Sequence, residues 1–449
     1  MDFEQFSAAA AAYARENGIS DYQLYYQADS SDQFSVFAGE LDQLASAQVE
    51  GVSLCCLVNG KKGTASTELF TAEEIPILFH RALEAAGFTG DDTPETLVTG
   101  GEYQPVSSRN VEMSDAAAVK ERLLTVEKVG LKADDRVQKG LMAEIANVSS
   151  RRAISNSAGL YLESQGSMSV FFVDVVASDA SGKKYNDHMV DAKADSREMD
   201  IEKLVGRAVE KTVAQIGAAT VPSGHYPIIF DNSQMTAMLE IFASVFSASQ
   251  VQDGLSLLKG KVGQQIASEA VTLVDDPFYP GSFFPCAFDA EGVPTRTKTV
   301  IEKGVLKQLL YDCAAARKDG VESTGNAYRS SYDAPVGIAP FTFYMQPGTL
   351  TREQLMQKAG KAIMITFMKG AHAGANPVTG DFSLESKGFL VENGKIVRAV
   401  EEITVAGNFF QMLKDITDVA DDLSVNTEDG ISCCGAPSVL VSDLAVAGC

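Results

Sequence analysis

The sequence predicts an α+β fold made of mixed, mainly antiparallel sheets with flanking helices. Short runs rich in β-branched and aromatic residues are separated by turn residues, a pattern typical of antiparallel pairing. Amphipathic helical segments lie between groups of such runs, and no strand-helix-strand series carries a dinucleotide-binding glycine pattern. The 449 residues exceed what one core usually holds, so we expect an N-terminal α/β region and a strand-rich C-terminal domain.

The first predicted subdomain covers residues 1–98. Phe3, Phe6, Ala10 and Tyr13 recur at helical spacing behind Asp2, a favourable N-cap residue. Strands are predicted at 22–27, 33–37 and 52–59, with a turn at 60–63 and a helix from 71 to 86 whose start carries a capping box.

The second predicted subdomain covers residues 113–220, after a polar connection at 88–112. It contains a helix centred on 120–127, strands at 141–148, 159–164 and 168–177, and a helix from 201 that ends before Gly217. Both stretches before residue 220 combine strands with helices, as a diverged duplication would, but their residues do not align. The segment 218–224, which contains Pro222 and Gly224, predicts the boundary of a C-terminal domain at 221–449, which begins with a strand at 226–230 and a helix at 233–249.

Composition excludes several classes of function. The net charge is −23, so an extended polyanion or an anionic membrane would be repelled, and direct nucleic-acid binding is not expected. No apolar run is long enough to cross a bilayer, and the acidic N-terminus lacks the basic start of a signal peptide. Seven cysteines without C-x-x-C spacing indicate free thiols in a reducing compartment, so a cytoplasmic location is expected.

The residues alone predict no catalytic group and no metal site. None of His80, His188, His225 and His372 has another ligand at metal-binding spacing, and the nucleophile elbow G-x-S-x-G is absent. The acidic pairs at 275–276 and 421–422 are expected to be solvated loop ends, because adjacent strand residues point to opposite faces.

One loop of small residues around His372 is a candidate binding segment. It runs from Gly370 to Asn376 and is followed by Gly380, Asp381, Phe382 and Ser383. Small residues allow a backbone to approach a ligand closely, although a plain flexible loop has the same composition.

Several segments in fixed order resemble the TldD/PmbA family, whose members are also called modulators of DNA gyrase. The resemblance covers nearly the whole chain, and it is carried by segments at residues 39–42, 63–67, 222–227, 262–263, 267–269, 274–276, 288–295, 323–327, 380–383 and 406–408.

The resemblance implies where a zinc motif would fall. The catalytic type of the family carries an H-E-x-x-x-H helix and a further Cys ligand near the C-terminus. A gapless count places this motif on Leu239, Glu240 and Ser244, so both histidines are missing. The surrounding stripe of apolar residues at helical spacing instead predicts a packing face, made of Met235, Met238, Leu239, Phe242, Val245 and Phe246.

These departures resemble the PmbA (TldE) side of the family. The resemblance then implies a metal-free subunit that pairs with a zinc-bearing TldD-type protease subunit and helps to enclose unfolded or short peptides. In that arrangement the 370–383 loop is the candidate chamber loop, and Cys433 and Cys434 lie near the expected Cys position without completing a site. The alternative is a stand-alone, homodimeric regulatory or binding protein of the gyrase-modulator type, without protease activity.

Overall fold

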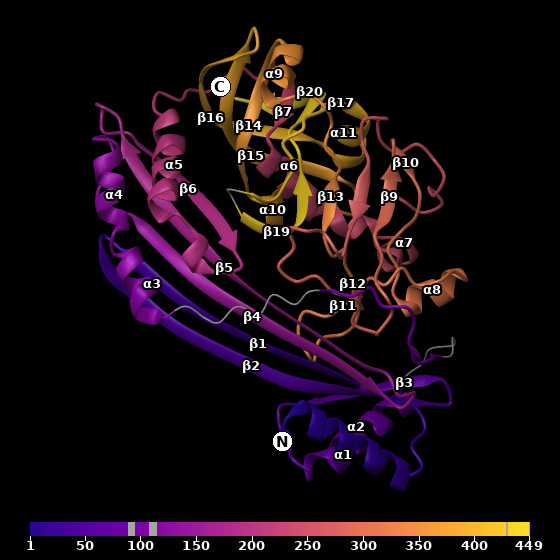
Figure 1. Cartoon of the computed structure of the whole chain (residues 1–449). Coiled ribbons are helices and arrows are strands. Elements are labelled where there is room, and N and C mark those ends of the chain that lie inside the picture. The colour runs from indigo at the N-terminus through magenta and orange to yellow at the C-terminus, as the bar shows by residue number, and fades with distance from the viewer. Residues whose placement is uncertain (89–94, 107–114, 428–429, 449) are drawn as a thin grey trace.

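The computed structural model describes residues 1–88, 95–106, 115–427 and 430–448, and it confirms the predicted α+β class. A long, curved N-terminal sheet supports a C-terminal domain that lies over one of its faces (Figure 1). The predicted connection at 88–112 falls partly outside the described residues. No helix in the described part of the chain is long and apolar enough to span a membrane.

The N-terminal sheet is antiparallel throughout, in the order β3-β2-β1-β4-β5-β6. Its strands are longer than predicted, because polar residues such as 28–32 continue β1 where β2 and β4 supply backbone hydrogen bonds on both sides. The strands are β1 (Tyr22–Phe37), β2 (Glu40–Val58), β3 (Lys61–Thr67), β4 (Met142–Asn156), β5 (Tyr161–Ser178) and β6 (Lys184–Lys193).

Helices cover one face of this sheet at both ends. One end packs against α1 (Phe3–Glu16) and α2 (Glu74–Phe88). The other end packs against α3, α4 and α5, so the single helix predicted around 120–127 is in fact two helices. These are α3 (Ala116–Leu123), α4 (Val126–Ala133) and α5 (Ile201–Ala214), with a 3-10 helix at Ser196–Glu198.

The opposite face of the sheet lies against the C-terminal domain. Side chains alternate along a strand, so Tyr25 and Arg152 point to this face while Tyr26 and Arg151 point to the other. A Cβ atom on Gly166 of β5 would lie 2.7 Å from the carbonyl oxygen of Phe283, so the loop around 283 rests directly on the sheet.

The C-terminal domain contains two large sheets that enclose α6 (Asn232–Phe242). One has the order β10-β9-β8-β13-β19-β18. The other has the order β16-β15-β14-β7-β20-β17, and β16 also pairs with β20, which closes five of its strands into a ring. The strands of the first sheet are β8 (Leu273–Asp275), β9 (Lys298–Glu302), β10 (Val305–Leu306), β13 (Phe343–Met345), β18 (Ser424–Thr427) and β19 (Gly430–Ala436). Those of the second are β7 (Gly224–Phe230), β14 (Lys361–Lys369), β15 (Asp381–Glu392), β16 (Lys395–Asn408), β17 (Ile416–Val419) and β20 (Val439–Ala447), and a separate pair is β11 (Ala327–Tyr328) with β12 (Gly337–Ile338).

The helix predicted at 233–249 is interrupted. After α6 the chain forms a 3-10 turn at Ala243–Phe246 and then α7 (Ala248–Gln252). The break arises because Phe246 and Ala248 exchange backbone hydrogen bonds with Leu310, which draws the chain away from the helix axis. The remaining helices are α8 (Cys313–Asp319), α9 (Arg352–Ala359), α10 (Ala371–Gly374) and α11 (Phe409–Asp415).

Candidate functional site

A cavity of about 520 Å³ lies between the N-terminal sheet and the C-terminal domain. We call it the Glu240 cavity, because Glu240 near the end of α6 lines it together with Cys433 of β19. Tyr25, Arg152 and Met168 contribute from β1, β4 and β5. Its other walls are largely apolar and aromatic, and include Phe283, Phe284, Phe288, Tyr328 and Phe341.

The three degenerate zinc-motif positions do not converge in this cavity. Leu239 is fully buried in the core between the two C-terminal sheets, and Ser244 is exposed on the 3-10 turn beyond α6. Glu240 alone of the three lines the cavity. The predicted stripe around Leu239 packs as a core, since all six of its side chains are at most 1% exposed.

Glu240 and Cys433 are two side chains that could in principle bind a metal. Zinc sites use at least three protein ligands, and no group of three His, Cys, Asp or Glu side chains gathers anywhere in the described residues. The donors present therefore do not fit a zinc site, and the metal-free status of the chain stays a prediction.

The two adjacent cysteines have different environments. Cys434 is fully buried and packs against α6, whereas Cys433 is exposed toward the cavity. A side-chain hydrogen bond with Cys434 lowers the pKa of the Cys433 thiol, against the opposing effects of burial and of the Glu240 carboxylate.

Two arginines lie near Tyr25: Arg152 of β4 lines the cavity, whereas Arg329 follows β11 of the C-terminal domain and does not line it. Arg329, only 6% exposed, lies over the Tyr25 ring at 4.9 Å and donates to the Ser53 hydroxyl at 2.8 Å. Burial lowers the pKa of Arg329. Arg152 lines the cavity itself, and its positive charge, like that of Arg329, opposes the raised pKa that burial gives to Tyr25. Sequence reasoning missed these residues, because adjacent arginines at 151 and 152 do not reveal which one faces the cavity.

A buried polar network lies next to the cavity and joins family-like segments. Lys298 donates to Asp275 at 3.0 Å and to Asn326 at 3.0 Å, and Asn326 also donates to Asp275 at 2.8 Å. Asp275 is 0% exposed, so the expectation that it is a solvated loop end was wrong. The carboxylate is stabilised in the interior by the Lys298 charge and by the Phe341 amide, which donates to it at 2.7 Å.

Asp289 ties two more of these segments together. It accepts hydrogen bonds from the amides of Glu291, Val293 and Ala327, at 2.9, 3.0 and 3.0 Å. Burial raises its pKa, while these amides act in the opposite direction. Asp289 therefore holds the family-like segments 288–295 and 323–327 together.

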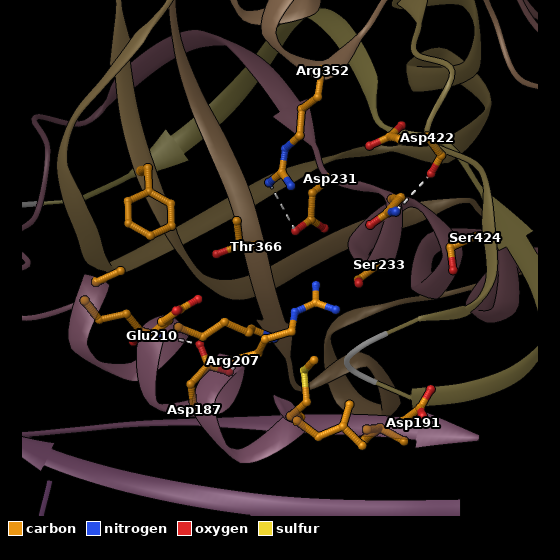
Figure 2. A pocket seen from close by; sticks show the side chains of 18 of the residues that line it. Asp187, Asp191, Arg207, Glu210, Asp231, Ser233, Arg352, Thr366, Asp422 and Ser424 are labelled. Carbon is orange, nitrogen blue, oxygen red and sulfur yellow. Dashed lines mark hydrogen bonds and ion pairs between the residues drawn. The ribbon is translucent and has the colours of Figure 1, made fainter. Parts of the chain in front are cut away.

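A second, larger hollow of about 780 Å³ lies between α5, β6 and the start of α6 (Figure 2). Its charged groups mostly engage one another: Arg352 lies 3.9 Å from Asp231, and Lys211 lies 3.6 Å from Asp187. Asp422 accepts from both the amide and the hydroxyl of Ser438 at 2.7 Å. We interpret this groove as a polar seam between the domains.

The histidines lie apart from one another. His80 is near Glu84 at 3.6 Å, His225 is 2.8 Å from Asp443, and His188 stacks on Phe172.

The candidate chamber loop lines neither cavity. His372 is exposed on α10, and Asp381 and Ser383 are exposed on β15, whereas Phe382 of β15 is buried in the core and contacts Phe242. Gly380 has a φ of +82° and sits against Phe410, so a glycine is needed there for structural reasons. A role of this loop in a chamber shared with another subunit stays a prediction.

Profiles of the PmbA/TldA metallopeptidase match the chain as domain 1 at residues 22–86, as central domain at 109–216 and as C-terminal domain at 223–448. The chain therefore belongs to the PmbA/TldD family.

Individual relatives are similar over almost their whole length. A curated protein of Methanothermobacter thermautotrophicus, described as a metalloprotease, is 29% identical over 90% of this chain and 88% of its own. A solved structure from Thermotoga maritima, described as a modulator of a DNA gyrase, is 32% identical with a TM-score of 0.90, covering 99% of this chain and 100% of that one. TldE from Thermococcus kodakarensis shares the fold, with a TM-score of 0.87 at 23% identity over 98% and 100% of the two chains.

Proposed function

We propose that this chain is the metal-free subunit of a TldD/TldE-type heterodimeric metalloprotease that acts on unfolded or short peptides. The observation that carries the proposal is the environment of α6. A family helix that would hold zinc ligands here presents a buried Leu239, an exposed Ser244 and only Glu240 toward the cavity. Zinc would then reside in the TldD-type partner, where it would activate water for attack on a peptide carbonyl.

The cavity supports a role in holding peptides. Its volume and aromatic walls are within the range of small-ligand sites, and it opens beside Cys433 between two domains. In the pair, this subunit would contribute walls and binding surface, and the exposed His372 and Ser383 would face the shared chamber.

The test is cleavage of an unstructured peptide by this chain, by a TldD-type subunit from the same genome, and by their mixture. We expect chelator-sensitive cleavage in the mixture and none by this chain alone, because the described residues supply no metal site. Glu240→Gln should leave the mixed enzyme active, whereas Ser383→Glu should weaken it without unfolding the chain.

Two results would count against the proposal. Chelator-sensitive cleavage by this chain alone, abolished in Glu240→Gln, would make it an active enzyme. Failure of the two subunits to associate would favour the stand-alone, homodimeric regulatory protein.

A further inference from the structure

Among the described residues Arg152 has no ion-pair or hydrogen-bond partner, although Glu240 and Asp289 also line the largely apolar and aromatic cavity into which it faces. Its Nε is buried and has no hydrogen-bond partner, and no ion pair joins Arg152 to any described residue. Its neighbour Arg151, on the opposite face of the same sheet, is paired with Glu163 at 2.7 Å. Removing an unpaired guanidinium partly from water costs free energy of folding. An anionic ligand that paired with Arg152 would offset this cost.

The nearby acidic groups do not neutralise Arg152. Asp29 lies diagonally from it on the same face of the sheet, but is engaged by Gln27, whose amide donates to it at 2.6 Å. Asp289 is held by three backbone amides, and Glu240 lies by Cys433 on the C-terminal domain. Arg152 is also the one cationic side chain among the described residues that line the cavity.

From this arrangement we propose that the Glu240 cavity binds the C-terminal carboxylate of a peptide, and that the Arg152 guanidinium pairs with this carboxylate. The inference rests on the proposed peptide-handling function and names the part of the peptide that this subunit recognises. A guanidinium matches the two oxygens of a carboxylate, and the aromatic walls suit the apolar side chain next to it. Tyr25, held under Arg329, forms the floor beside the anchor.

The proposal is tested by binding to the purified full chain without any partner subunit. The probes are an N-terminally dye-labelled Gly-Ala-Phe-Ala-Phe peptide as the free acid, the same peptide as the C-terminal amide, and an amide in which Glu replaces the central Phe. Fluorescence anisotropy should show the free acid binding about tenfold tighter than the amide, as expected for one charge-assisted pair. Tight binding by the Glu-containing amide would assign the site to carboxylates in general, whereas weak binding would assign it to the C-terminus.

Substitutions of the two adjacent arginines make the test specific. Arg152→Met should remove the preference for the free acid and leave binding of the amide unchanged, and Arg152→Lys should retain part of the preference. Arg151→Met is the matched control on the other face and should retain all of it. The thermal midpoint of Arg152→Met should equal or exceed that of the unaltered chain, since an unpaired cation is removed.

Equal binding of acid and amide by the unaltered chain would overturn the proposal, as would no binding of either. A preference that survives in Arg152→Met would also overturn it. Because no cleavage is measured, failure of the heterodimeric protease proposal would leave a carboxylate preference intact, so the two ideas fail separately.

Discussion

Cys433 and Cys434 are neighbours on β19, yet their thiols lie in different surroundings. Side chains alternate between faces, so Cys434 enters the core while Cys433 faces the cavity. The other cysteines whose shifts are resolved are disfavoured as thiolates: burial raises the pKa of Cys55, Cys286 and Cys313, and that of Cys56 to about 12. Cys433 therefore combines access with a lowered pKa.

We expect iodoacetamide to modify Cys433 before any other described cysteine. The thiolate is the nucleophile, so a lowered pKa means that the modification rate reaches half its maximum below pH 9, the ordinary value for the thiol. Mass mapping of the alkylated peptides across a pH series measures this. Cys433→Ser should abolish the fast phase, and a fast phase that persists there would contradict the assignment.

At the scale of the element, α6 is a packing helix, because the apolar side chains along one of its faces are buried. Leu239→Ala should lower the free energy of unfolding by about 2–5 kcal/mol, because it opens a cavity at a fully buried position. Urea denaturation of the full chain measures the change. Ser244→Ala, at the other position where the resemblance would place a histidine, is exposed and should be nearly neutral; equal effects of the two substitutions would refute the packing role.

The buried ion pair between Asp275 of β8 and Lys298 of β9 gives a second prediction at this scale. Lys298→Met should destabilise the chain by about 3–5 kcal/mol, because it leaves the fully buried Asp275 carboxylate without its cation. The matched control is Lys307→Met, which breaks a surface pair with Glu302 at 3.2 Å and should cost less than about 1 kcal/mol. A Lys298→Met variant as stable as this control would show that Asp275 is satisfied by Asn326 and the Phe341 amide alone.

The spacing of apolar residues predicted which helices and strands exist better than it predicted where each one ends. The apolar stripe of α6 was readable because its spacing is local, whereas the break after Phe242 depends on Leu310, some sixty residues away, which no local pattern reveals. The polar middle of β1 was missed for the same reason. The cavity was harder still to predict, since Tyr25, Arg152, Glu240 and Cys433 meet only through tertiary packing.

At the scale of the whole molecule, the proposed pairing with a TldD-type subunit predicts which of the two subunits binds zinc. The chain dialysed alone should contain no stoichiometric zinc, whereas its complex with a TldD-type subunit should contain about one zinc per pair. Elemental analysis of both samples measures this. About one zinc per isolated chain, lost in Cys433→Ser or Glu240→Gln, would instead show a site completed by ligands outside the described residues.

The placement of β20 has a consequence for how the chain is made. This strand, Val439–Ala447, lies between β7 and β17 and also pairs with β16, so a strand made more than two hundred residues after Gly224 occupies the interior of the sheet that begins there. While the chain is still attached to the ribosome, the edge of β7 is open to wrong partners. Nascent chains should therefore depend on chaperones until β20 has left the ribosome, and a chain that stops before Val439 would lack the strand that closes the ring.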